Sequence, residues 1–301
     1  MSIVRFSGHE SFICKQLWPK KGFDFLNNGN NFNDSDAIVK LGVGKNMVLS
    51  IRYWMKSLGL IDENDSLTEV AKKILADDGF DPYLEDVGTI WLFHYFLVSK
   101  NYASIYNLVF NEFLKINNEF TKLGLHNHIK RISTNTIGSS YNEHTVNTDI
   151  NVFIRNYMQP DHESKITSFE DEYSGLFLDL NLIKHLKRQD AEEQNKEYYI
   201  IERTERKSLP KEIFLYVVLD NMQSGNSISF NELVSGSNSV GNVFQLNRDG
   251  VYQKIEELIS EVGFLKFTHT AGIPLLTFTF KPNAQDILAS YYENVHIHSV
   301  D

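Results

Sequence analysis

The feature that most constrains this chain is a pair of glycines, Gly42 and Gly44, between two segments with apolar residues at helical spacing. Glycine is favoured where a helix ends and where the backbone turns sharply. The pair therefore predicts two helices joined by a tight turn. The first has Asp34 or Ser35 as its N-cap, and the second runs from Lys45 and ends at Gly59.

A small hairpin is predicted directly after the second helix. Leu60–Ile61 and Leu67–Thr68 are short apolar pieces on either side of the polar turn 62–66. Thr68 then has the position of an N-cap for a helix over residues 70–75. Helix, glycine turn, helix and hairpin is the order of a winged helix-turn-helix. A generic helical hairpin is the alternative.

The rest of the chain also has a helical pattern, with short strands near the C-terminus. Residues 82–130 carry aromatic residues at helical spacing, which predicts a helical core. A polar stretch over 133–151 precedes another helix. From Leu209 onward the pattern again has winged-helix order. It predicts a helix over 213–222, a strand over 227–230, a short helix over 231–234, a loop over 235–242, a helix ending at Gly263 and a hairpin over 264–280.

These patterns predict a mainly α fold with small β-hairpins. Winged helix-turn-helix units at both ends are joined by a helical middle region. The corresponding domains are 1–80, with the N-terminal segment and first winged helix, 81–205, with the helical middle, and 206–301, with the C-terminal winged-helix-like domain.

Composition limits the functions that remain open. A net charge of −10 counts against attraction of the whole surface to nucleic acid but allows a local basic face. Cys14 is the only cysteine, which excludes an intrachain disulfide and a thiolate metal cluster within one chain. The sequence has neither signal-peptide features at its start nor an apolar window long enough to cross a bilayer, so we expect no membrane association and a cytoplasmic location.

The second predicted helix is the best candidate for contact with DNA. Lys45, Asn46, Ser50 and Arg52 are predicted to face duplex DNA, because Asn can read adenine and Arg can read guanine or phosphate. Trp54 is assigned to the core with the rest of the apolar stripe. The alternative is a solvated helix face. The segment also resembles part of a phosphate loop, but the residues required around its Gly-Lys pair are missing, so we reject a nucleotide site.

Candidate catalytic groups come from two short segments. His9 and Glu10, beside Lys15, could supply acid–base chemistry or bind a metal. The alternative is a hydrogen-bonded His9–Glu10 pair that holds the N-terminal segment on the core. Asp81, Glu85 and Asp86 follow the first winged helix, and the alternative for Asp81 is a helix cap with Pro82 in the first turn.

Two weaker sets complete the candidates. Asp149 and Arg155 lie in the helix predicted after the polar stretch, and Arg155 is included among the DNA-binding residues. Asp179 lies within one apolar run, and Glu205 and Lys207 follow a second, strand-like run. A carboxylate on one strand with Glu-x-Lys on a second is the metal-binding pattern of many nucleases. The alternative for Glu205 and Lys207 is a charged connector into the last domain.

Several motifs together resemble one bacterial family, the SspB-like proteins of DNA phosphorothioation systems, catalogued as domain-of-unknown-function family 4007. The similarity covers nearly the whole chain and is most specific in the first hundred residues. Its motifs are Phe6-x-Gly-His-Glu-Ser-Phe12, residues 36–47, Ser50-Ile-Arg-Tyr-Trp54, Leu67-Thr68, residues 81–86, Trp91-Leu-Phe-His94, more weakly residues 149–155, and Leu209-Pro210 with residues 212–216.

The resemblance implies a DNA-binding component of a phosphorothioate modification and anti-phage defence complex, a form of restriction-modification. It implies strand nicking, which as an enzymatic activity would require Mg or Mn as the metal cofactor. The implied partners are double-stranded DNA, the cysteine desulfurase, ATP pyrophosphatase and ATPase of the same cassette, and a second copy of the chain as a homodimer. The alternatives are a non-enzymatic winged-helix transcription regulator and a protein-binding scaffold of the same cassette.

Overall fold

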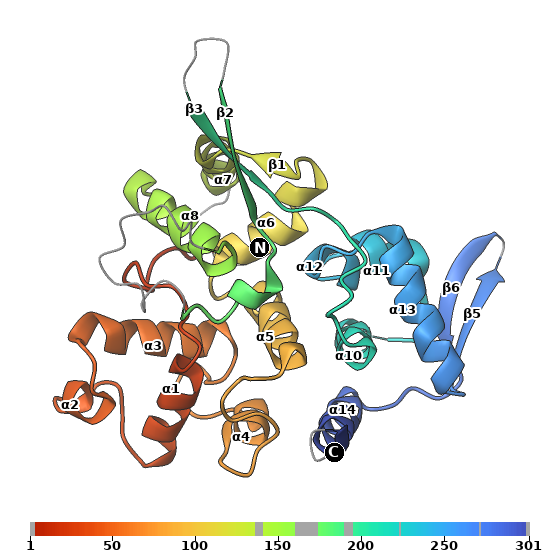
Figure 1. Ribbon diagram of the computed structural model, residues 1–301, viewed down its shortest axis with the longest axis horizontal. Helices are drawn as coiled ribbons and strands as arrows, with labels where there is room; N and C mark the ends of the chain where they lie inside the picture. The colour runs from red at the N-terminus through yellow and green to blue at the C-terminus, as the bar shows by residue number, and fades with distance from the viewer. Residues whose placement is uncertain are drawn as a thin grey trace. The chain divides into compact units, whose positions relative to one another are not determined.

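The computed structural model describes residues 4–135, 141–159, 174–189, 195–222, 224–270 and 272–298. The chain forms two compact units, Met1–Glu202 and Arg203–Asp301, which we call the first and second units. In its described residues, each unit is mainly helical and contains a small antiparallel sheet (Figure 1). The further division of the first unit at residue 80 stays a prediction.

The helices around the paired glycines form as predicted. α2 (Ala37–Leu41) ends at Gly42, whose φ of 63° is left-handed, and α3 (Lys45–Ser57) begins after Gly44. Ile61 and Leu67 then form an antiparallel bridge across the polar turn. The Thr68 hydroxyl accepts a hydrogen bond from the Ala71 N–H at 3.3 Å and so caps α4 (Glu69–Leu75).

Two details near these helices differ from the prediction. α2 starts later than expected, because the Asp34 carboxylate accepts from the Asn31 N–H and so stabilises the preceding loop. The sequence pattern also did not indicate α1 (Trp18–Asn27), whose buried face includes a lysine. The Lys20 ammonium lies 2.7 Å from Asp24 and 2.6 Å from Asp77, and this pairing allows a charged residue in an otherwise apolar stripe.

An aromatic core fills the middle of the first unit, as predicted. Every residue of α5 from Gly88 to Val98 is buried, and the His94 ring of α5 packs edge to face with aromatic rings of α6 and α8, which also pack edge to face with one another. α8 begins well before the predicted position, because Asn142 caps it by accepting from the Thr145 N–H. The helices are α5 (Val87–Ser99), α6 (Ser104–Asn111), η1 (Phe113–Lys115), α7 (Lys122–Asn135) and α8 (Glu143–Tyr157).

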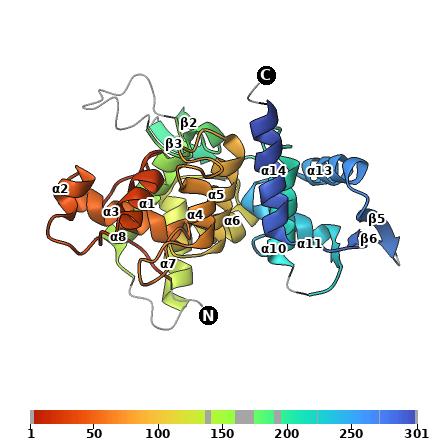
Figure 2. The same ribbon diagram turned by 90° about the horizontal axis from the view of Figure 1, so that it is seen from below.

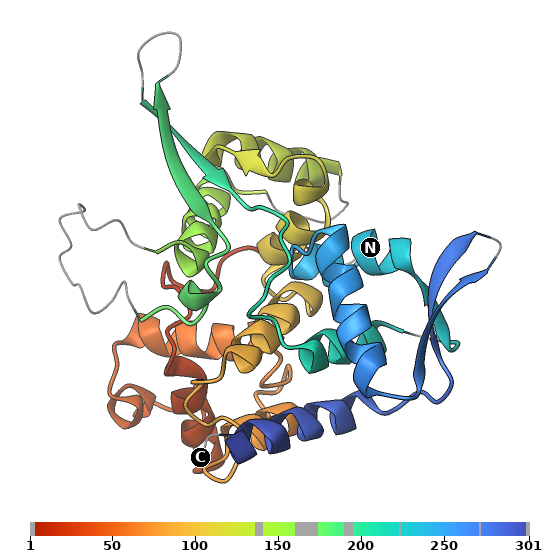
Figure 3. The ribbon, with the colours of Figure 1, turned by 45° about the vertical axis from the view of Figure 1, so that its right-hand side comes forward.

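A three-stranded antiparallel sheet completes the first unit after η2 (Leu178–Leu180). Its strand order is β1-β3-β2, and β2 and β3 pair as a hairpin with Lys187 opposite Glu197. The hairpin extends away from the helices of its unit (Figure 3). The strands are β1 (Glu119–Phe120), β2 (Lys184–Gln189) and β3 (Asn195–Ile200).

The second unit has the helix, strand, helix and hairpin order that the sequence predicts. Its sheet has the order β4-β6-β5, so the strand that follows the first helix pairs with the last strand of the hairpin. Phe214, Phe244 and Ile255 are fully buried in its core. The elements are α10 (Lys211–Asn221), β4 (Ser227–Ser229), α11 (Phe230–Ser235), α12 (Val240–Val243), α13 (Arg248–Glu261), β5 (Leu265–Thr270) and β6 (Ile273–Phe278).

Two elements of the second unit depart from the prediction. The expected loop over 235–242 contains the start of α12, which the Ser239 hydroxyl caps. The C-terminal residues form a helix, α14 (Ala284–His298), which packs against α10 (Figure 2). Leu288 and Tyr292 of α14 are buried, so apolar burial stabilises this helix. Within the described residues, no helix is both long and apolar enough to cross a bilayer.

Candidate functional site

The segment Ser7–Ser11 has an unusual backbone. Ser7, Glu10 and Ser11 have φ values of 73°, 48° and 64°, and Gly8 has a φ of 108°. Residues other than glycine rarely adopt this left-handed region, at a cost of about 1–3 kcal/mol each. Such strain persists only where surrounding contacts impose it, and it concentrates at functional sites. We call this segment the N-terminal turn.

His9 and Asp149 hold the N-terminal turn in place. Asp149 Oδ1 lies 3.0 Å from His9 Nε2, and the Ser7 N–H donates to the same carboxylate at 3.1 Å. His9 Nδ1 accepts from the Ser11 N–H at 3.1 Å, so Nε2 carries the proton and donates it to Asp149. Both His9 and Asp149 are buried.

This arrangement corrects the roles expected for His9 and Glu10. Both ring nitrogens of His9 are engaged within the fold, so His9 has no nitrogen available to exchange a proton with a substrate. His9 does hold the N-terminal segment on the core, but its partner is Asp149 rather than Glu10. Glu10 is exposed in the turn. It remains the candidate for chemistry in this segment.

Side chains of α3 pack against the N-terminal turn. The Ser50 hydroxyl donates to the His9 carbonyl at 3.0 Å, and the Trp54 ring stacks on His9 with centroids 6.3 Å apart. A Cβ at Gly8 would lie 2.6 Å from Tyr53 Cδ2, so the turn and the ring approach as closely as glycine allows. Burial, followed by the Asp149 charge, raises the pKa of Tyr53 well above its usual value.

The burial of Ser50 corrects its predicted role in DNA contact. Ser50 is 0% exposed and Tyr53 is 5% exposed, so neither side chain can reach a ligand on the surface. The prediction treated α3 as a helix with one buried face. The N-terminal turn covers a second face, which leaves a narrower exposed stripe. Trp54, Ile51 and Met55 are buried, which confirms their assignment to the core.

The exposed stripe of α3 carries the other predicted contacts. Lys45 and Asn46 are exposed at the start of the helix, and Leu49 is 41% exposed. The Arg52 side chain is 31% exposed and pairs with Asp65, with Nη2 2.7 Å from Oδ2. α3 contains Lys45, Arg52 and Lys56 and no acidic residue. Lys45 and Arg52 are therefore the accessible cations of this stripe, whereas Lys56 is largely buried.

Arg155 lies beside the N-terminal turn rather than on α3. It is exposed on α8, and its Nη1 donates to the Ser11 carbonyl at 3.3 Å. The turn thus brings an exposed carboxylate, Glu10, and an exposed guanidinium to one part of the surface. Arg155 and the turn are far apart in the sequence, so neither periodicity nor spacing could show that they meet.

Asp81 and Asp86 accept hydrogen bonds from backbone N–H groups, and a catalytic role for either stays a prediction. The Asp81 carboxylate is buried and accepts from the N–H groups of Glu85 and Asp86 at 2.9 and 3.1 Å. Asp86 caps α5 by accepting from the Gly88 and Thr89 N–H groups. The cap of the next helix is therefore Asp86 rather than Asp81, and Pro82 lies outside that helix. Glu85 is exposed.

The looser nuclease-like pattern does not lie on strands. Asp179 is in η2, while Glu205 and Lys207 lie in the segment before α10. Within the described residues, no three His, Cys, Asp or Glu side chains are placed to hold a metal ion together. The strand-borne nuclease pattern is therefore not formed, and Glu205 and Lys207 lie in the segment that leads to α10, as the connector alternative expects.

Cys14 lies just after the N-terminal turn and is fully buried. Its N–H donates to the Asn156 amide oxygen at 3.0 Å, which ties it to α8. Burial strongly raises the pKa of its thiol. The thiol is therefore protonated at neutral pH and has no nucleophilic role in the folded protein.

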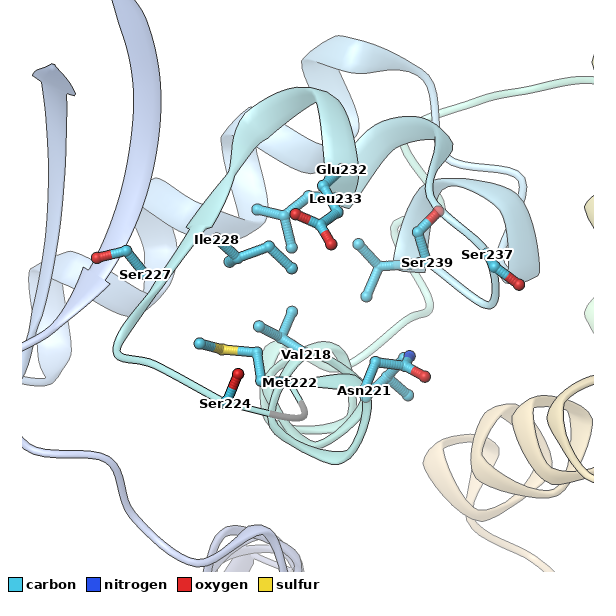
Figure 4. Close-up of a pocket in the computed structure, with 12 residues that line it drawn as sticks. Val218, Asn221, Met222, Ser224, Ser227, Ile228, Glu232, Leu233, Ser237 and Ser239 are labelled. Carbon is cyan, nitrogen blue, oxygen red and sulfur yellow. The ribbon is translucent and has the colours of Figure 1, made fainter.

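The second unit contains a pocket of about 470 Å³ between α10, β4 and α11. Val218, Met222 and Ile228 supply apolar contacts, and Glu232 places its carboxylate toward the space between them (Figure 4). Serine hydroxyls surround the rest of the opening. The lining residues all lie between Val217 and Val240, and the sequence pattern did not indicate the pocket because periodicity does not show how consecutive elements pack on one another.

The described residues define a mainly helical protein with two small antiparallel sheets. The model of a family described as "Protein of unknown function (DUF4007)" matches residues 6–292, so the chain belongs to this family. Two solved structures are similar to it, "Magnesium ion-bound SspB crystal structure" and "SspB crystal structure", with TM-scores of 0.83 and 0.81. Each solved structure is 28% identical in sequence to this chain. The match covers 96% of this chain and 88% of the chain in each solved structure. The predicted SspB-like character is thus confirmed, while no curated protein matches.

Proposed function

We propose that the chain is a duplex-DNA-binding component of a bacterial DNA phosphorothioate modification and defence complex. The SspB-like fold supports a place in such a complex, with the cassette's cysteine desulfurase, ATP pyrophosphatase and ATPase as partners. The observation that carries DNA binding is the charge of α3. Its cations are Lys45, Arg52 and Lys56, it has no acidic residue, and its first residues are exposed.

Phosphate neutralisation by lysine and arginine supplies most of the affinity for duplex DNA. The first turn of a helix adds main-chain N–H groups that favour anions, and Lys45 and Asn46 stand there on α3. We assign Lys45, Asn46 and Arg52 to the DNA-facing stripe. Arg155, near the N-terminal turn, is a separate candidate contact.

We further propose that each unit contains a winged helix. In the first unit, α2, the glycine turn, α3 and the bridge between Ile61 and Leu67 support this assignment. In the second unit, α10, β4, α11, α13, β5 and β6 follow in winged-helix order, with the β4-β6-β5 sheet. α3 and α13 would then be the corresponding recognition helices.

The test is duplex binding by the full chain, measured by fluorescence anisotropy over a range of salt concentrations. Replacing Lys45 and Arg52 with Ala should weaken binding and flatten the salt slope by about two units, near one for each lost phosphate contact. The matched control replaces Lys72 and Lys73 of α4 with Ala, which removes the same charge from exposed positions. Equal effects of the two double variants would contradict a DNA face on α3.

Strand nicking is the enzymatic part of the proposal, and Glu10 is its candidate residue. One solved SspB structure is described as magnesium ion-bound, so magnesium and manganese are the metals to test. The described residues offer no convergent set of carboxylates for such an ion, and we assign no metal ligands. Glu10→Gln should lower nicking of supercoiled plasmid by about 100-fold or more. Glu143→Gln, an exposed change on α8, is the control, and full activity of Glu10→Gln would remove Glu10 from the mechanism.

A second candidate function, protein binding, is favoured for the second unit. α13 carries Asp249, Glu256, Glu257 and Glu261 against Arg248 and Lys254. Lys254 pairs with Glu257 at 3.0 Å, and Arg248 lies over the Phe230 ring at 4.8 Å. An acidic helix repels phosphate, so α13 is better suited to a partner of the modification complex than to DNA.

A further inference from the structure

A buried carboxylate fixes the position of the one arginine on α3. Asp65 is 8% exposed and has a left-handed φ of 63° in the turn between Ile61 and Leu67. Its two oxygens accept from Arg52 Nε at 3.1 Å and from Arg52 Nη2 at 2.7 Å. This side-on bidentate geometry holds a guanidinium in one plane and one direction.

A second contact restrains the other end of the same guanidinium. Arg52 Nη1 donates to the Asn33 amide oxygen at 3.2 Å, from the loop before α2. Arginine has five N–H groups, and these three contacts leave one on Nη1 and one on Nη2. The side chain is 31% exposed, so the guanidinium is braced from within the fold and is still accessible to solvent.

The buried carboxylate also contacts a lysine of α3. Lys56 Nζ lies 3.0 Å from Asp65 Oδ1, so Asp65 serves two cations of α3. Lys56 is largely buried, and its ammonium also donates to the Glu63 carbonyl. Glu63 also lies 4.0 Å from Lys56 Nζ, so two cations face two carboxylates here, and Arg52 is the more exposed of the two cations.

We propose that Asp65 and Asn33 are positioning residues that preset Arg52 to bind a backbone phosphate of duplex DNA. The proposal rests on DNA binding by α3. An arginine on a flexible stem loses rotamer entropy when it binds, whereas a braced arginine has already lost it. The negative charge of Asp65 opposes the binding of DNA phosphate. Its hydrogen bonds to Arg52 favour the same binding, because they hold the guanidinium in position.

These two effects of Asp65 have opposite signs, and Asp65→Asn separates them. Asparagine tolerates the left-handed backbone, so the turn is kept, while the bidentate carboxylate is lost. If Asp65 acted only through its charge, the variant would bind duplex DNA more tightly. Positioning instead predicts binding about 5- to 10-fold weaker, the loss expected when charge-assisted hydrogen bonds cease to orient a contact.

Glu63→Gln is the matched control. Glu63 is on the same turn and its carboxylate lies 4.0 Å from Lys56 Nζ, but the Glu63 side chain is 79% exposed. Removing this charge should leave binding unchanged or strengthen it by about twofold. Asn33→Ala removes the second brace without any change in charge, and should weaken binding by about two- to threefold. Asn33→Ala also tests the proposal if Asp65→Asn does not fold.

The experiment measures anisotropy of a fluorescein-labelled duplex with the full chain, and repeats both brace variants in an Arg52→Ala background. We expect no further loss there, because a positioning residue acts only through the residue that it positions. Tighter binding by Asp65→Asn, or an undiminished loss without Arg52, would overturn the proposal. A loss confined to guanine-containing duplexes would overturn the phosphate assignment. Absence of duplex binding by the wild-type chain would instead refute the proposed function.

Discussion

α3 of the first unit and α13 of the second unit follow a similar order of elements but differ in charge. Each comes after a shorter helix and a turn, and each precedes an antiparallel pairing. α3 has no acidic residue, whereas α13 has four acidic residues and two basic ones. Element order therefore does not determine the ligand, and the side chains on the exposed stripe do.

The supporting contacts differ as well. The N-terminal turn covers one face of α3 through Ser50, Tyr53 and Trp54, so α3 has two buried faces. Beyond α3 the antiparallel pairing is a single bridge, whereas β5 and β6 of the second unit pair over six residues each. A helix that is covered on two sides depends heavily on its core aromatic residues.

The largest expected effect concerns that dependence. Trp54→Ala should lower the free energy of unfolding by about 3–5 kcal/mol, because the ring is 1% exposed and contacts the N-terminal turn. Denaturant unfolding followed by circular dichroism measures it. Leu49→Ala, an exposed position on the same helix, should cost less than about 0.5 kcal/mol. A stable Trp54→Ala protein that selectively loses DNA binding would reverse the assignment of Trp54 to the core.

Two glycines that precede these helices, Gly42 in the turn before α3 and Gly241 in α12, should respond unequally to one added methyl group. A Cβ at Gly241 would lie 2.1 Å from the Val234 carbonyl oxygen, so Gly241→Ala should cost about 3 kcal/mol through overpacking. Gly42 has open space around it and only its φ of 63° opposes alanine, so Gly42→Ala should cost about 1 kcal/mol. Thermal unfolding of both variants tests the difference, and equal costs would mean that the surroundings of the two glycines are packed alike.

Asp149→Asn tests whether the N-terminal turn contributes to the stability of the first unit. The amide keeps one acceptor but replaces the other with a donor, which opposes the N–H groups of His9 and Ser7. The free energy of unfolding should fall by about 1–3 kcal/mol. Glu143→Gln on the same helix is exposed and should be neutral. A neutral Asp149→Asn would show that the turn is not coupled to the core.

Charge reversal on α13 tests whether the difference in charge between α3 and α13 determines which helix binds DNA, and its expected effect is the smallest. Glu256→Lys should strengthen duplex binding by about three- to tenfold at low salt if only charge keeps DNA from this helix. Asp286→Lys makes the same change at an exposed site on α14. An equal gain in both variants would indicate non-specific attraction and would show that charge alone does not distinguish α13 from other acidic surfaces.

Local pattern predicted the helices that have clear stop signals. Gly42, Gly44 and Thr68 ended or capped helices where expected, because these residues act through their own backbone. α1 and α14 were missed because tertiary burial rather than a strong local signal supports them. α14, for example, depends on Leu288 and Tyr292 packing against α10.

The candidate site was less predictable, because its contacts join distant segments. His9 and Asp149 are 140 positions apart, and Asp65 reaches Arg52 only through the fold of the turn. The periodicity of α3 also could not reveal that the N-terminal turn covers Ser50 and Tyr53. Lys45, Asn46 and Arg52 remain on the exposed stripe that the sequence indicated.

Because Cys14 is buried, the reactivity of its thiol can report local unfolding of the first unit. Its thiol is the only one in the chain, is 0% exposed, and has a pKa raised by burial, so alkylating reagents can reach it only in opened molecules. When reclosing is fast, the alkylation rate equals the reagent's rate with a free thiol multiplied by the opened fraction. Labelling with iodoacetamide, followed by mass spectrometry, would therefore measure local stability around the N-terminal turn without any substitution.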